Sequence, residues 1–251
     1  MRNMIHTGLV SVSFRDLSPE EIAQEMVKCG LKYVEWGSDV HAPCADTARL
    51  EQIVSLQKQY GITCCSYGTY FRLGFTPNTE LPAYICAAKR LGTKTLRLWA
   101  GKKSPDMYTP EERDGFFDVC RQAAKLAEDA GVVLCMECHR NSYTQTKDGA
   151  LELMLAVNSP AFRMYWQPNQ TLTFQENMEY IQALRPYIDN LHVFHMKDQI
   201  RYPLSTGEEE WKTYLGQFAG DRMALLEFMP DGQVESLPVE AQTLRRIAAA
   251  S

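Results

Sequence analysis

The sequence lacks the features that would set it apart from ordinary soluble globular proteins. Its 251 residues contain no apolar run near the roughly 18 residues that a membrane-spanning helix needs. The opening residues, MRNMIHTGLVSVSF, have no apolar stretch of the length found in a secretory signal. With 45% hydrophobic and 23% charged residues, the composition excludes a disordered or collagen-like chain. We therefore expect a globular, cytoplasmic protein without a membrane partner.

Positive charge is also scarce. Lysine and arginine number 26 against 31 aspartates and glutamates, so the formal net charge is -5 at pH 7. A nucleic-acid-binding protein usually carries a basic stripe or face, and no such stripe is visible in the sequence. We therefore expect no nucleic-acid partner. The mild acidity is compatible with a neutral small molecule as the substrate.

Cysteine is present, but not in the pattern of a disulfide framework. Cys29, Cys86 and Cys120 fall on the apolar faces of predicted helices, as buried thiols do in a reducing compartment. Cys135 and Cys138 form a CxxC pair inside a predicted strand. Positions three apart on a strand point to opposite faces, so we expect neither a metal site nor a redox pair there.

Short apolar runs alternate with longer amphipathic stretches along the chain, and the runs recur about every 31 residues. The apolar runs predict strands at residues 9–13, 33–36, 63–67, 95–99, 132–137, 163–167, 191–195 and 224–227. The amphipathic stretches predict helices at residues 19–28, 47–59, 80–90, 110–129, 146–157, 174–187, 208–216 and 238–249.

This alternation favours a parallel sheet with helices outside it. The length suits a single α/β domain, residues 1–251, folded as a (β/α)8 TIM barrel. A doubly wound open sheet is the alternative. It would normally bring a glycine-rich turn after the first strand, and residues 10–15 contain no glycine.

Polar side chains follow the last four predicted strands. In barrel enzymes the carboxyl ends of the strands carry the chemistry, and these strands run into Glu137, Gln167, His195 and Glu227. Two converging carboxylates repel each other unless a cation lies between them. Oxygen and nitrogen ligands of this kind suit Mn²⁺, Co²⁺, Mg²⁺ or Zn²⁺. The pattern therefore predicts a divalent-metal site, from which His192 is left out because it has the opposite strand parity.

Each of these residues also has a plain structural interpretation. A glutamate at a strand end is often solvated or caps a helix, and a histidine in an apolar strand is often a hydrogen-bonded structural group. Gln167 is placed to bond the backbone of the turn at Pro168. Four such residues at the same end of successive strands favour the metal site over four separate structural roles.

Further side chains near the predicted mouth are candidates for substrate binding. Aromatic rings pack well against the apolar face of a sugar, although barrel–helix packing is an equal alternative for the two tryptophans. A lysine there is able to bind a carboxylate or phosphate, or to pair with a neighbouring acid. The candidates are Trp36, His41, Trp99, His139 and Lys197. Glu35 and Asp39 cluster with Trp36 and His41 after the second predicted strand as pocket walls, and Phe14, Tyr67 and Tyr70 are rim residues without a specific signal.

The segments LCMEC in strand five, HVFHMKD in strand seven and LLEF in strand eight carry a family resemblance. Along essentially its whole length the chain resembles the xylose isomerase-like barrel superfamily, the sugar isomerase/epimerase group that includes ketose 3-epimerases and inosose dehydratases. The resemblance implies metal ligands at Glu137, at the position of Gln167, at His195 and at Glu227. It also implies that Arg201, six residues after the metal-binding histidine, holds sugar hydroxyls.

The chain departs from the family pattern at three places. Gln167 replaces the usual aspartate ligand, Gln170 stands where the epimerase branch has a histidine, and Tyr143 stands where that branch has a substrate-binding glutamate. An amide brings no charge, so we expect weaker metal binding. Gln170 is kept as a substrate-binding candidate, while strict ketose 3-epimerase activity is put in doubt.

The resemblance implies a divalent-metal-dependent isomerase or epimerase of a small sugar or polyol derivative. The cation would acidify a C–H next to a carbonyl, and Glu137 and Glu227 would serve as ligands and as proton carriers of an enediolate mechanism. The alternatives are a dehydratase or lyase acting on a keto-inositol or keto-sugar, and a sugar-binding protein that has lost catalysis. Members of the group are often dimers or tetramers, so a homo-oligomer is compatible with the resemblance.

Overall fold

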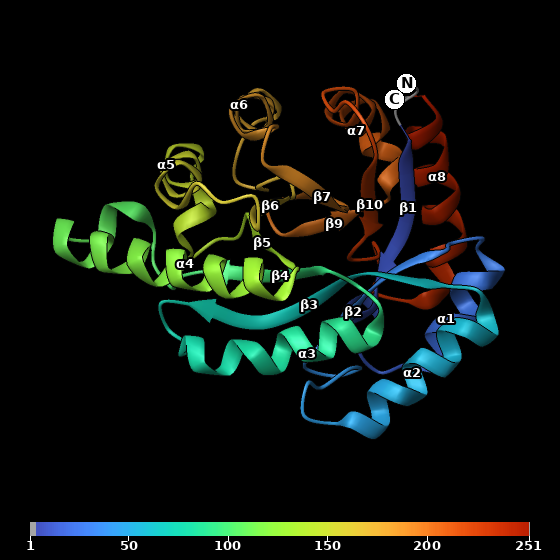
Figure 1. Ribbon diagram of the computed structural model, residues 1–251. Coiled ribbons are helices and arrows are strands. Elements are labelled where there is room, and N and C mark those ends of the chain that lie inside the picture. Colours follow the sequence, from blue (N-terminus) through green and yellow to red (C-terminus); the bar gives the residue numbers. More distant parts are fainter. Residues whose placement is uncertain (1–3, 251) are drawn as a thin grey trace.

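A computed structural model describes residues 4–250. Eight parallel strands close into a barrel in the order β1-β10-β7-β6-β5-β4-β3-β2, with helices packed around it (Figure 1). The barrel strands are β1 (Ile5–Val10), β2 (Tyr33–Gly37), β3 (Thr63–Leu73), β4 (Thr95–Ala100), β5 (Val133–Glu137), β6 (Phe162–Trp166), β7 (Ile188–Val193) and β10 (Arg222–Leu226). The predicted (β/α)8 TIM barrel is confirmed.

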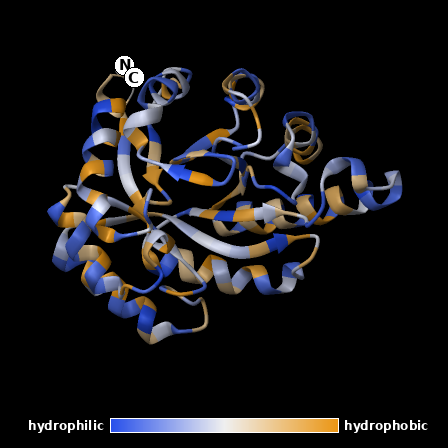
Figure 2. Ribbon diagram, turned by 180° about the vertical axis from the view of Figure 1, so that it is seen from behind, coloured by the Kyte–Doolittle hydropathy of each residue, from blue (hydrophilic) through white to orange (hydrophobic). Residues whose placement is uncertain are grey.

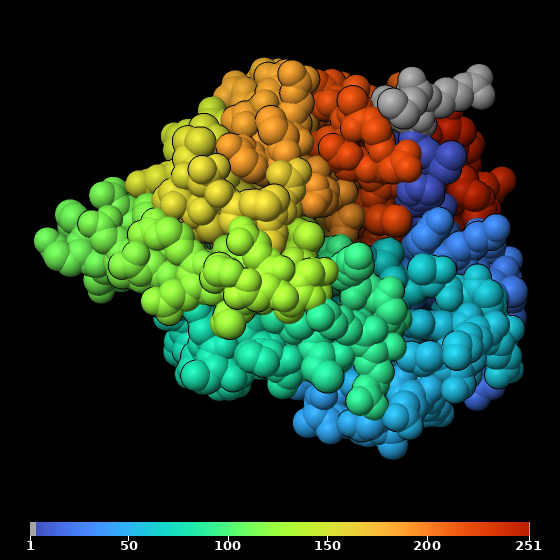
Figure 3. Space-filling view, in the orientation of Figure 1, coloured from blue at the N-terminus to red at the C-terminus, as the bar shows by residue number. Residues whose placement is uncertain are grey.

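The eight helices between residues 4 and 250 are α1 (Pro19–Lys28), α2 (Thr47–Tyr60), α3 (Leu81–Leu91), α4 (Pro110–Ala130), α5 (Lys147–Val157), α6 (Phe174–Leu184), α7 (Glu208–Leu215) and α8 (Leu237–Ala249). Five of them, α1, α2, α4, α5 and α6, begin at a residue whose side chain caps them. Ser18, Thr109 and Thr173 each form a capping box with the glutamate three residues later. The green segment around the start of α4 projects from the body in Figures 1 and 3.

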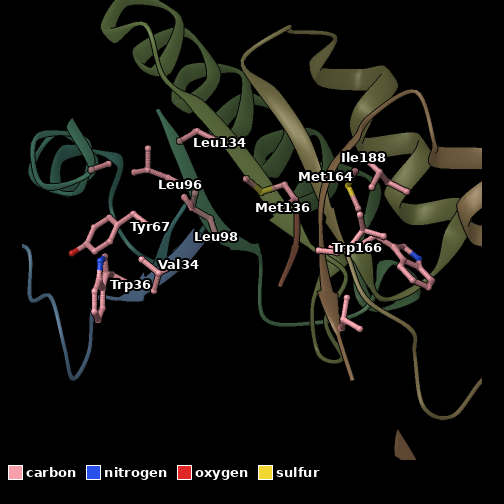
Figure 4. Close-up of a cluster of buried hydrophobic side chains, with 14 of the residues drawn as sticks. Val34, Trp36, Tyr67, Leu96, Leu98, Leu134, Met136, Met164, Trp166 and Ile188 are labelled. Carbon is pink, nitrogen blue, oxygen red and sulfur yellow. The ribbon is translucent and has the colours of Figure 1, made fainter. Parts of the chain in front are cut away.

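Apolar side chains form two separate layers. The larger layer lies between the strands and the helices, where Leu96, Leu134 and Met164 are buried (Figure 4). A small inner cluster around Cys135 and Tyr165 fills part of the barrel interior. Figure 2 shows that the outer helices carry both hydrophilic and hydrophobic residues along their length. The rest of the interior is therefore left to polar side chains.

The first and seventh strands begin earlier than predicted. β1 starts at Ile5, because residues from Ile5 to Leu9 pair with β10, and a 3-10 turn follows at Ser11–Phe14. β7 starts at Ile188 and ends at Val193, rather than spanning residues 191–195. The polar residues Asp189 and Asn190 precede the apolar run that begins at Leu191, which is why the prediction placed its start too late.

The shift in β7 separates its two histidines. His192 lies within the barrel strand, whereas His195 begins a small antiparallel hairpin made of β8 (His195–Lys197) and β9 (Ile200–Tyr202). Asp198 and Gln199 at its tip have positive φ angles of 49° and 65°, as a two-residue hairpin turn requires. No helix within residues 4–250 is long and apolar enough to cross a membrane.

Candidate active site

A cavity of about 570 Å³ lies at the carboxyl ends of the barrel strands. Seven of the predicted site residues line it: Trp99, Glu137, His139, Gln167, Gln170, Arg201 and Glu227. Tyr70, expected only as a rim residue, lines it as well, together with Arg15, Arg97 and Arg140, which were not predicted. The strands and their following loops therefore bring together carboxylates, guanidinium groups and aromatic rings in one space.

Glu137 is the last residue of β5 and is held by the neighbouring strand β4. Its Oε2 accepts a 2.7 Å hydrogen bond from the indole Nε1 of Trp99 and lies 3.1 Å from Nη1 of Arg97. The side chain of Glu137 is only 5% exposed. One oxygen of this carboxylate is thus fixed by two donors from the same strand.

Arg97 connects Glu137 to a second buried glutamate. Its Nε lies 3.4 Å from Oε1 of Glu35 on β2, and its Nη1 donates to the carbonyl oxygen of Thr69. Burial by itself would lower the pKa of Arg97, but Glu137 and Glu35 raise it above its usual value. Arg97 is therefore a permanent buried cation at the base of the cavity.

The close approach of Arg97 and Glu35 depends on Gly68 of β3. A Cβ atom at Gly68 would lie 2.5 Å from Oε1 of Glu35 and 3.1 Å from Nη2 of Arg97. Both distances are shorter than ordinary van der Waals contact, so a side chain here would displace the ion pair. Glycine at this position makes room for the buried charges.

Glu227 directly follows β10 and approaches His192 of β7. Burial raises the pKa of Glu227 to about 7, and Glu137 acts in the same direction, while His192 and Arg97 oppose the rise. Nδ1 of His192 lies 3.4 Å from Oε2 of Glu227, which has no hydrogen-bond partner among the described residues. This carboxyl group is therefore poised between its charged and neutral forms near neutral pH.

His192 is shared between Glu227 and Glu35. Its Nε2 lies 3.4 Å from Oε1 of Glu35. Burial would lower the pKa of His192, but Glu227 and Glu35 outweigh it and raise that pKa to about 9. Burial would likewise raise the pKa of Glu35, but His192 and Arg97 hold it at about 2. Glu35 and His192 thus form an ion pair inside the barrel.

Both polar atoms of the Gln167 side chain, immediately after β6, contact protein groups. Its Nε2 donates to the carbonyl oxygen of Cys138 at 3.2 Å, and its Oε1 lies 3.2 Å from Nδ1 of His192. Gln170, further along the same loop, has a buried Oε1 without a hydrogen-bond partner among the described residues. His139 lies beside Trp99, with 5.1 Å between ring centroids.

Four of the predicted site residues do not line the cavity. Two of them lie in or near β2 and have structural roles. Trp36 is buried against α2 and donates to Oε1 of Gln57 at 3.0 Å. His41 is within hydrogen-bond distance of Ser11 and of the Leu17 carbonyl. Sugar stacking by Trp36 is thus replaced by barrel–helix packing, the alternative considered for it.

The other two lie on the β8–β9 hairpin. Lys197 is exposed, with its Nζ 3.4 Å from Oε1 of Glu210. His195 is buried against Gly207, where an added Cβ would lie only 2.0 Å from its Nδ1, and burial lowers its pKa. The structure therefore does not bring His195 together with Glu137 and Glu227. His192 occupies the interior position instead.

The arrangement does not fit the four-ligand metal site predicted from the sequence. Within the described part of the chain, no group of three or more His, Cys, Asp or Glu side chains is placed to hold a metal ion. Arg97 and His192 already offset the carboxylates of Glu137 and Glu227, and His195 lies outside the cavity.

The buried charges had a visible signal in the sequence, because Glu35 in YVEWG and Arg97 in TLRLWA each interrupt an apolar strand in its middle. Glu35 was expected only as part of a pocket wall after strand two, and Arg97 was not predicted, because the strand ends were expected to carry the site. Arg15 and Arg140 lie in irregular segments with no distinguishing pattern.

An eight-stranded barrel with carboxylates at the carboxyl ends of its strands is the architecture of a large class of enzymes. A sequence profile described as "Xylose isomerase-like TIM barrel" matches residues 23–227. The chain therefore belongs to the xylose isomerase-like TIM barrel family, as the resemblance predicted. A 3-dehydroshikimate dehydratase from Bacillus anthracis is 23% identical over 202 residues, which cover 74% of this chain and 70% of that protein.

Solved structures share the fold. The probable 3-dehydroshikimate dehydratase of Bacillus anthracis superposes with a TM-score of 0.80 at 18% identity, covering 96% of this chain and 99% of that one. D-psicose 3-epimerase of Clostridium cellulolyticum H10 gives 0.71 at 12% identity, covering 98% and 99%. A family member from Mycobacterium smegmatis in complex with magnesium gives 0.68 at 13% identity, covering 100% and 99%. Proteins of this fold thus include an epimerase and a dehydratase, and one of them, described as a xylose isomerase-like TIM barrel protein, is bound to magnesium.

Proposed function

We propose that the chain is a dehydratase, which removes a proton from the carbon beside a carbonyl of a small hydroxylated substrate and expels a hydroxyl group as water. The observation that carries this proposal is the unequal treatment of two glutamates in one cavity. Glu137 is fixed by Trp99 and Arg97, whereas Glu227 keeps one oxygen without a hydrogen bond and has a pKa near 7. One mobile proton carrier beside a fixed charge suits elimination.

In the proposed reaction Glu227 takes the proton and Arg97 stabilises the charge that develops. The C–H electron pair forms a new carbon–carbon double bond, and the hydroxyl on the next carbon leaves with its bonding electrons. The proton held by Glu227 joins that hydroxyl, so water is released and the carboxylate is regenerated. The buried guanidinium of Arg97 offsets negative charge on the carbonyl oxygen of the intermediate enolate.

The second candidate is the isomerase or epimerase that the sequence favoured. It is supported by the fact that both carboxylates, Glu137 and Glu227, line the same cavity. An epimerase needs one group to remove the proton and another to return it on the opposite face. Trp99 and Arg97 both hold Oε2 of Glu137, so this carboxylate is less free to carry a proton than Glu227, which is why elimination is preferred.

We propose a small-molecule substrate and a cytoplasmic location for either activity. The eight cysteines are all free thiols, which is the state that a reducing compartment maintains.

The proposal is tested by incubating the protein in D₂O with 3-dehydroshikimate, a keto-inositol and D-fructose, each with and without Mn²⁺, and following the mixtures by NMR. We expect loss of water from a substrate and a new carbon–carbon double bond. Solvent deuterium incorporated without loss of water would instead identify the isomerase or epimerase.

Two isosteric variants separate the active-site role of Glu227 from a general effect of losing a buried carboxylate. Glu227→Gln should abolish turnover. Glu240→Gln is the matched control, because Glu240 is also buried but accepts a hydrogen bond from the Leu204 backbone outside the cavity. Turnover by Glu227→Gln at the wild-type rate would overturn the proposal.

A further inference from the structure

The charges that line the cavity are unbalanced. The lining includes four arginines, Arg15, Arg97, Arg140 and Arg201, but only two acidic residues, Glu137 and Glu227. Both acids are already offset deeper in the barrel, Glu137 by Arg97 and Glu227 by His192. The mouth of the cavity is therefore positively charged, although the chain as a whole carries a net charge of -5.

Two of these arginines have no carboxylate and no hydrogen-bond acceptor within reach among the described residues. Among residues 4–250, the arginines with neither an ion pair nor a side-chain hydrogen bond are Arg140, Arg185 and Arg201, and two of the three line the cavity. By contrast, Arg15 is bound by Asp39 and Tyr70. The unpaired guanidinium groups thus gather at the one cavity that holds the carboxylates.

Arg201 is directed to the cavity by its surroundings. It pairs with Met196 across the β8–β9 hairpin, and its guanidinium carbon lies 4.8 Å from the ring centroid of Phe228. Phe228 follows Glu227 and has a φ of +58°, a backbone conformation that is unusual for a bulky side chain. Such residues occur preferentially at functional sites. One strained segment therefore carries both the proposed proton carrier and the support of Arg201.

We propose that Arg140 and Arg201 together bind an oxyanion of the substrate, a carboxylate or a phosphate, so that the substrate is an acid rather than a neutral sugar. The planar guanidinium matches both groups by paired hydrogen bonds. This inference rests on the proposed function, because it takes the cavity as the substrate site. It gives Arg201 a different role from the binding of sugar hydroxyls that the family resemblance implied.

The test compares probes that differ only in charge. 3-Dehydroshikimate is compared with its methyl ester for the carboxylate source, and D-fructose 6-phosphate with D-fructose for the phosphate source. Binding is measured by titration calorimetry at low and high salt. In one of the two pairs we expect the anion to bind on the order of tenfold more tightly, as charged hydrogen bonds provide, with the preference reduced by salt.

Variants assign that preference to the two residues. Arg140→Gln and Arg201→Gln should each weaken it, and the double variant should remove it. Arg185→Gln removes the third unpaired, exposed guanidinium, which lies outside the cavity, and should leave it intact. A folded double variant that keeps the preference, or wild-type protein that binds each anion no better than its neutral partner, would overturn the inference.

The proposed function is scored separately, by the release of water from any of the substrates, charged or neutral. If the wild-type protein turns over a neutral ketone but shows no preference for an anion, the inference fails and the proposed function stands. If the anion preference depends on Arg140 and Arg201 but no probe is turned over, the inference stands and the proposed function fails.

Discussion

The indole Nε1 of Trp99 on β4 donates a 2.7 Å hydrogen bond to Oε2 of Glu137 on the adjacent strand β5. Arg97, two residues earlier on β4, approaches the same oxygen. Side chains at alternate positions of a strand share a face, so β4 supplies both groups to the cavity side of the sheet. The orientation of Glu137 is consequently set by its neighbouring strand rather than by its own loop.

Loss of the Trp99 hydrogen bond should impair turnover. Trp99→Phe keeps an aromatic ring and removes the N–H donor. A hydrogen bond to a charged group contributes about 1.5–3 kcal/mol, so we expect kcat/KM to fall roughly tenfold to a hundredfold. Trp36→Phe is the control, because it removes the indole donor that bonds Gln57 outside the cavity. Steady-state kinetics should show no comparable loss in the control, and an equal loss in both variants would contradict the prediction.

The pH dependence of turnover should follow Glu227. The proposed reaction needs this carboxyl group ionised, and its pKa is raised to about 7. The ionised fraction grows with pH, so kcat/KM should rise tenfold per pH unit well below 7 and level off above it. His195→Asn should leave this rise of kcat/KM with pH unchanged, because His195 lies outside the cavity. A profile that is flat between pH 5 and 8 would argue against Glu227 as the base.

The strand-end residues of the site could be predicted from the sequence, whereas the interior charges could not. Glu137, Gln167 and Glu227 each stand at or just after the last residue of an apolar run, and the barrel then brings them together. The choice between His192 and His195 depended on where β7 ends. That end is set by its pairing with β10, in which Val193 is opposite Leu226. The sequence of β7 alone does not reveal such a long-range pairing.

The ion pair between Arg97 and Glu35 was missed for a related reason. Each lies in the middle of an apolar strand, where a lone charge is costly unless it is paired. The partner comes from another strand, 62 residues away in the sequence. Only the closed barrel brings the two residues together, so that each charge offsets the cost of burying the other.

Substitution of Gly68 should destabilise the protein through this ion pair. In Gly68→Ala the new Cβ would lie 2.5 Å from Oε1 of Glu35, and overpacking of this kind costs about 1–3 kcal/mol. Gly115→Ala is the matched control, because it lies within α4 with nothing within 4 Å of its added Cβ. It should instead stabilise by about 0.5–1 kcal/mol. Urea unfolding measures both changes, and destabilisation by the two variants alike would contradict this account of Gly68.

Removal of divalent metal should leave the fold unaffected. Arg97 and His192 supply the positive charge beside the buried glutamates, so the folded state does not need a cation to offset them. A ligand that binds only the native state stabilises it by RT ln(1 + [L]/Kd) and so raises Tm. We therefore expect the same Tm after dialysis against EDTA and after addition of 1 mM Mn²⁺, a concentration that is about a thousandfold above a Kd in the micromolar range. A rise of several degrees with Mn²⁺ that is lost in His195→Asn would show instead that the hairpin rearranges to bring His195 into the cavity as a ligand.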